Sequence, residues 1–136
     1  MVVSDQPDAD ASVAATLAGA PRFAVILWLT FRTLGSVITV PIAEELAFRG
    51  YVLRKLINSD FENVGFGQFT WLSFLGSSIL FGILHGGWLA GIAAGMIFAA
   101  TTYHRSKLSD AVCAHVTSNL LLSAYVLLFH RWSLWT

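Results

Sequence analysis

The stretch VPIAEELAFR, residues 40–49, places two adjacent carboxylates and an arginine after a long apolar run. Glu44 and Glu45 are next to each other, and Arg49 follows four residues after Glu45. An ionised group at membrane depth is costly unless it is paired or serves a function. The stretch therefore indicates a functional site carried by a helix within an otherwise apolar chain.

The composition is that of a membrane protein. The chain has 136 residues, of which 56% are hydrophobic and 12% charged, and its mean hydropathy is +0.68. The chain is therefore far more apolar than a soluble domain of this size. Eight basic and eight acidic residues give a formal net charge of zero, so no basic field indicates a nucleic-acid partner. We expect an integral membrane protein whose surroundings are the lipid bilayer.

Four apolar segments are long enough to cross a hydrocarbon core, which takes about 20 residues of helix. They are residues 23–43, 69–85, 88–104 and 111–129. The charged segment that begins at Glu44 is helical in character and ends in a turn-rich stretch. We predict an all-α fold, a polytopic transmembrane bundle of about four spans with an additional amphipathic or re-entrant charged helix.

The N-terminal residues differ from the rest of the chain. Residues 1–20 contain Asp5, Asp8 and Asp10 but no Lys or Arg, which is the reverse of a signal peptide. We predict a flexible polar tail over residues 1–20 and a single membrane-embedded core over residues 21–136.

Three pairs of residues spaced four apart carry the chemistry. Residues four apart share one face of a helix, so Glu45 and Arg49 can form an ion pair. The same spacing relates Phe81 to His85 and His115 to Asn119.

Any one of these polar groups could serve only helix cohesion. Two carboxylates, two histidines and an amide together exceed what a few short helices need for that purpose. The combination indicates a shared polar site.

The segments EELAFR (44–49), FGILH (81–85) and HVTSN (115–119) resemble, in order and spacing, the three motifs of the CPBP intramembrane proteases. This group contains the type II CAAX prenyl endopeptidases and bacteriocin-processing or immunity proteins of the ABI family. The short core also resembles the CAAX-protease-related proteins associated with exosortase systems. The resemblance implies an endopeptidase in a prokaryotic inner membrane, acting on a membrane-associated peptide or protein.

The resemblance also implies roles for individual residues. Glu44 would be the general base that activates a water molecule, and His85 would hold and polarise that water. His115 and Asn119 would stabilise the oxyanion, for which preorganised N–H donors are well suited. Glu45, Arg49 and Phe81 would support the site, with Glu45 and Arg49 orienting Glu44.

Several alternatives stay open at this point. We expect no cofactor, but Glu44, His85 and His115 could bind zinc, because a carboxylate and two imidazoles form an adequate ligand set. A non-catalytic membrane partner or immunity protein could use the same polar cavity to bind a peptide, and a small proton-relay subunit would also carry acids and histidines in helices. The sequence has no HExxH motif, no GxSG motif and no Asp within the four apolar segments, so other intramembrane protease classes find no support.

Overall fold

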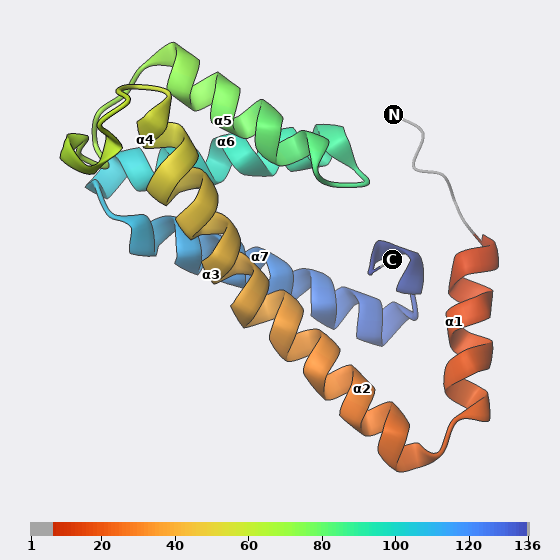
Figure 1. Ribbon diagram of the computed structural model, residues 1–136. Coiled ribbons are helices and arrows are strands. Elements are labelled where there is room, and N and C mark those ends of the chain that lie inside the picture. Colours follow the sequence, from red (N-terminus) through yellow and green to blue (C-terminus); the bar gives the residue numbers. More distant parts are fainter. Residues whose placement is uncertain (1–6, 136) are drawn as a thin grey trace. The chain divides into compact units, whose positions relative to one another are not determined.

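The computed structural model describes residues 7–135. Over this range the chain forms helices joined by turns, without strands (Figure 1), which confirms the predicted all-α class for the described residues. Contacts divide the chain into two compact units. One unit runs up to Thr39 and resumes at Thr117, and the other is Val40–Val116.

Seven α-helices and four short helical segments of other types make up the described range. The α-helices are α1 (Pro7–Gly19), α2 (Arg22–Leu34), α3 (Val40–Glu45), α4 (Leu53–Lys55), α5 (Trp71–Ile83), α6 (Trp88–Arg105) and α7 (Leu108–Phe129). The π-helical segments are η1 (Gly35–Thr39) and η2 (Leu46–Val52), and the 3₁₀ segments are η3 (Phe61–Asn63) and η4 (Trp132–Leu134).

Two helices in the described range are long and apolar enough to cross a membrane, Arg22–Lys55 with 34 residues and Leu108–Phe129 with 22. The predicted count of about four spans is not confirmed. Helix α5 is apolar, but its 13 residues extend only about 20 Å at 1.5 Å per residue, less than the roughly 30 Å of a hydrocarbon core. Helix α6 has 18 residues, and its last turns are polar.

The charged segment after Glu44 continues the first long helix and does not form a separate amphipathic helix. Residues 22–55 are helical throughout, and the π-helical turns η1 and η2 flank α3. Pro41 lacks an N–H, and in a regular α-helix its ring would crowd the carbonyl four residues earlier, so a regular α-helical turn is disfavoured here. The π-helical turn η1, just before Pro41, is wider than an α-helical turn and allows the helix to continue past the proline.

Helices α5 and α6 pack closely within the unit Val40–Val116 (Figure 1). A Cβ atom on Gly91 would lie 2.9 Å from the Cα of Gly82, and one on Gly95 would lie 3.1 Å from the Cα of Ser78. The absence of a side chain at Gly91 and Gly95 therefore lets α5 and α6 approach each other closely. At Gly87 a Cβ would meet only ordinary van der Waals contact, 4.0 Å from Ala90.

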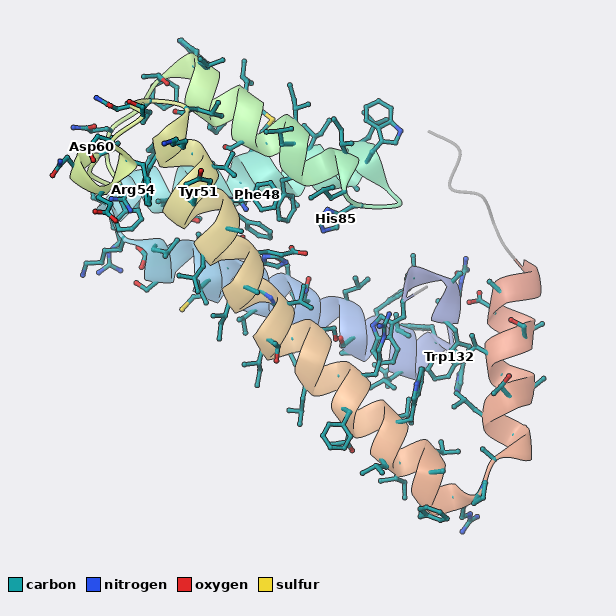
Figure 2. All side chains as sticks on the ribbon, viewed as in Figure 1. Phe48, Tyr51, Arg54, Asp60, His85 and Trp132 are labelled. Atoms are coloured by element: carbon teal, nitrogen blue, oxygen red, sulfur yellow. The ribbon has the colours of Figure 1, made fainter. Side chains whose placement is uncertain are left out.

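The core of this unit is aromatic. Phe48, Phe81, Phe98 and Ala111 form one buried cluster. Figure 2 shows Phe48 extending from the continuous helix toward α5, and its ring meets that of Phe81 edge-on at a centroid distance of 5.1 Å. The cluster joins η2, α5, α6 and the first turn of α7.

The other unit contains a helix where we expected a flexible tail. Residues 1–6 lie outside the described residues, but Pro7–Gly19 forms α1, whose many alanines favour helix. Asp10 pairs with Arg131 at 3.3 Å and accepts a hydrogen bond from the backbone N–H of Ser133. Together with a cluster of Val126, Trp132 and Trp135, against which Val13, Leu17 and Leu29 pack, these contacts hold α1 against η4.

The faces of the candidate spans are apolar where they are exposed. On α2 the side chains of Phe23, Ile26 and Phe31 are 73%, 65% and 68% exposed. On α7 Leu128 is 72% exposed. Large exposed apolar patches mark surfaces that contact lipid or protein, so these faces are suited to a bilayer.

Candidate active site

Three elements of the unit Val40–Val116 bring one carboxylate and two imidazoles together. Glu44 lies on α3, His85 follows the end of α5, and His115 lies on α7. The Oε2 atom of Glu44 is 3.7 Å from Nε2 of His85 and 3.8 Å from Nε2 of His115. The sequence predicts that Glu44, His85, His115 and Asn119 share one site. These distances bring the first three together, and the chemical roles of all four stay predictions.

The Glu44 side chain is placed so that another molecule can join this group. It is 28% exposed, and His85 is 36% exposed, whereas His115 is buried at 4%. Within the described part of the chain, the shielded Oε2 atom of Glu44 has no hydrogen-bond partner. A buried carboxylate oxygen without a donor is unfavourable, so a small donor such as water is an expected occupant beside it.

A hydrogen bond to the backbone fixes the orientation of His85. Its Nδ1 lies 2.7 Å from the carbonyl oxygen of Phe81, one turn earlier. A carbonyl only accepts, so this bond places a hydrogen on Nδ1 and turns Nε2 toward Glu44. The rings of Phe81 and His85 are 4.5 Å apart, as the four-residue spacing predicted. Figure 2 shows His85 at the turn between α5 and α6.

The predicted contact between Glu45 and Arg49 is present and fully buried. Nη1 of Arg49 donates to Oε1 of Glu45 at 3.0 Å, and both side chains are 0% exposed. Nη2 of Arg49 donates to the carbonyl oxygen of Gly95 at 2.7 Å. The guanidinium carbon lies 4.6 Å from the ring centroid of Phe81, a distance typical of a cation–π contact.

Glu45 also contacts His115, which the sequence did not predict. Nδ1 of His115 lies 2.9 Å from Oε1 of Glu45, the same oxygen that Arg49 contacts. The imidazole stacks on the ring of Phe98 at 4.5 Å with an interplanar angle of 18°. The sequence does not predict this hydrogen bond or the roles of Gly95 and Phe98. These contacts join residues that are far apart in the sequence, so they depend on how the helices pack.

Asn119 belongs to the other compact unit. It lies on α7 one turn after His115, and its side-chain amide donates to the carbonyl oxygen of Ser36 at 2.7 Å. That bond uses one of the two N–H groups of the amide. The sequence-based role of Asn119 as an oxyanion donor stays a prediction.

Zinc would require ligand atoms about 2.0–2.2 Å from a common point. Among residues 7–135, no group of three or more His, Cys, Asp or Glu side chains has an arrangement that could hold a metal ion. The Oε2 atom of Glu44 lies 3.7 Å from Nε2 of His85 and 3.8 Å from Nε2 of His115, so a small molecule beside the carboxylate can also contact an imidazole. This arrangement is suited to binding and polarising water.

A profile of the family described as "Type II CAAX prenyl endopeptidase Rce1-like" matches residues 26–121. The chain belongs to this family. The match covers Glu44, Glu45, Arg49, Phe81, His85, His115 and Asn119, and so includes each residue that the sequence assigned to the site. The search of curated proteins found no match, and neither did the search of solved structures.

Membership of the Rce1-like family agrees with the membrane character of the chain. The family is membrane-embedded, and the described residues include two helices of sufficient length and hydropathy to span a bilayer. The family name also indicates protease activity.

Proposed function

We propose that this Rce1-like protein is an intramembrane endopeptidase that hydrolyses a peptide bond of a membrane-associated protein or peptide. The observation that carries the proposal is the position of Oε2 of Glu44, 3.7 Å from Nε2 of His85 and 3.8 Å from Nε2 of His115. As the resemblance implies, the protein would act in the inner membrane of a prokaryotic cell. Its substrates would be peptides that reach the site from the bilayer or its surface.

In the proposed reaction, Glu44 is the general base. Its carboxylate accepts a proton from a bound water while the water oxygen forms a bond to the carbonyl carbon of the substrate. The electron pair of the carbonyl double bond moves to its oxygen. When the carbon–nitrogen bond breaks, the departing nitrogen takes up one proton, which gives an amine and a carboxylic acid.

The two imidazoles have different proposed tasks. Nε2 of His85 accepts a hydrogen bond from the water and holds it against Glu44, with the ring fixed by Phe81. His115 and Asn119 are the proposed stabilisers of the oxyanion. Losing one such donor commonly reduces the rate by about 10²–10³-fold.

The test is cleavage of a fluorogenic farnesylated CAAX peptide, and of membrane-anchored leader-type peptides, by the purified protein in lipid nanodiscs. We expect Glu44→Gln to lower the rate at least about 100-fold, since general-base catalysis contributes roughly 10²–10⁴-fold. Glu62→Gln is the matched control, because Glu62 lies in an exposed segment outside the site, and it should cleave at the wild-type rate.

Two results would count against the proposal. Undiminished cleavage by the Glu44→Gln variant would remove Glu44 as the base. Tight binding of a peptide by wild-type protein, without cleavage of any probe, would favour the non-catalytic membrane partner or immunity protein.

A further inference from the structure

Glu45 uses a single oxygen atom for two buried hydrogen bonds. Oε1 accepts from Nη1 of Arg49 at 3.0 Å and lies 2.9 Å from Nδ1 of His115. Both carboxylate and guanidinium are fully buried, and His115 is 4% exposed. The contact with a guanidinium favours the ionised carboxylate, which can only accept hydrogen bonds. The hydrogen between Glu45 and His115 therefore belongs to Nδ1 of the imidazole.

This bond determines what the other nitrogen of His115 can do. In a neutral imidazole only one nitrogen carries hydrogen, so Nε2 presents a lone pair. That lone pair is on the side of Glu44, with 3.8 Å between Nε2 and Oε2. Stacking on Phe98 and the edge contact with Phe81 at 5.8 Å fix the plane of the ring. Before the reaction begins, Nε2 of His115 is thus an acceptor and not a donor.

We propose that Glu45 is a positioning residue that keeps the hydrogen of His115 on Nδ1, so that Nε2 relays a proton from Glu44 to the reacting substrate. The relay rests on the proposed peptidase function. The proton that Glu44 takes from water moves to Nε2, and Glu44 returns to its carboxylate form. The imidazolium so formed donates its Nε2 hydrogen to the oxyanion and then releases it to the nitrogen as the carbon–nitrogen bond breaks.

Glu45 also stabilises the charge of that intermediate. When Nε2 takes up a proton, the hydrogen bond from Nδ1 to Oε1 of Glu45 becomes charge-assisted and therefore stronger. A buried carboxylate has the same two effects on the histidine of serine proteases, where it fixes the tautomer and stabilises the imidazolium. This role differs from the support of Glu44 that the sequence predicted for Glu45.

The direct readout is the tautomer of His115, measured from ¹⁵N chemical shifts of labelled histidine in nanodiscs. The measurement is made at pH 8.5, where imidazoles are ordinarily neutral, and the His115 signals are identified by their loss in His115→Gln. We expect hydrogen on Nδ1 and a bare Nε2 in the wild-type protein. A wild-type His115 with its hydrogen on Nε2 would overturn the proposal.

A double variant separates positioning from simple charge balance. Glu45→Met together with Arg49→Met removes the buried pair and leaves side chains of similar length, a change that commonly preserves stability. We expect His115 to shift its hydrogen partly to Nε2, while His85, held by the carbonyl of Phe81, keeps its own on Nδ1 as an internal control. Cleavage should fall at least about 100-fold, in line with loss of a tautomer-fixing carboxylate.

Failure of this inference can be told from failure of the proposed function. If the double variant folds, keeps the wild-type tautomer and cleaves at the wild-type rate, Glu45 only neutralises Arg49 and the relay is wrong. If the wild-type protein cleaves no probe, the peptidase function and the relay fall together. The tautomer measurement then still decides whether Glu45 positions His115.

Discussion

Replacing Gly91 with alanine should displace His85 by disturbing the contact between α5 and α6. A Cβ at this position would lie 2.9 Å from the Cα of Gly82, 3.2 Å from its carbonyl oxygen and 3.2 Å from Cβ of His85. Carbon atoms normally pack at about 3.5–4.0 Å, so α5 and the turn that carries His85 must retreat by roughly 0.5–1 Å. A misplacement of about 1 Å at a reacting group can lower the rate about 100-fold.

The same substitution should also affect stability. Overpacking of a close contact typically costs about 1–3 kcal/mol, which exceeds the gain of up to about 1 kcal/mol from replacing a helical glycine with alanine. We expect a lower midpoint of thermal unfolding in detergent and a lower cleavage rate in nanodiscs.

Gly86→Ala is the matched control for this experiment. Gly86 adjoins His85 in the sequence, a Cβ there would meet nothing within 4 Å, and its φ is not in the left-handed region. This variant should resemble the wild type in both assays. If Gly91→Ala behaves like Gly86→Ala in stability and in rate, the close packing of Gly91 against Gly82 does not position His85.

Two further predictions concern the buried ion pair and metal dependence. Arg49→Met leaves Glu45 buried without its cation and should lower the free energy of unfolding by about 3–5 kcal/mol, measured by thermal unfolding. Arg105→Met is its control, because Arg105 is 63% exposed and pairs with Asp110 at 3.6 Å, and it should cost no more than about 1 kcal/mol; equal losses would contradict the structural role of Arg49. Cleavage should survive dialysis against a zinc chelator, whereas loss of cleavage with recovery on adding Zn²⁺ would assign the site to zinc chemistry.

Local spacing was sufficient to predict much of the site. The four-residue spacing of Glu45 with Arg49 and of Phe81 with His85 gave contacts that the structure contains, because a helix fixes which side chains share a face. The helical class and the approximate bounds of α6 and α7 followed from apolar runs of sufficient length.

The remainder depends on tertiary packing that spacing does not encode. Glu45 contacts His115, which is 70 residues away in the sequence. The ring of Phe98 stacks on His115 because α6 and α7 pack together at this point. The apolar run 69–85 looked long enough for a span, but α5 ends at Ile83 so that His85 can sit in a turn. The alanines of α1 favoured a helix where its polar residues had indicated a tail.

The central claim, that Glu44 and His85 face each other in one site, can be tested without a substrate by solid-state NMR. The chain contains only three glutamates and four histidines, so dipolar dephasing between ¹³C-labelled glutamate carboxyls and ¹⁵N-labelled histidines is resolvable. With Oε2 of Glu44 3.7 Å from Nε2 of His85, we predict dephasing of that nitrogen that disappears in Glu44→Gln and persists in Glu62→Gln. Dephasing of Nε2 of His85 that is absent, or unchanged by Glu44→Gln, would contradict the account.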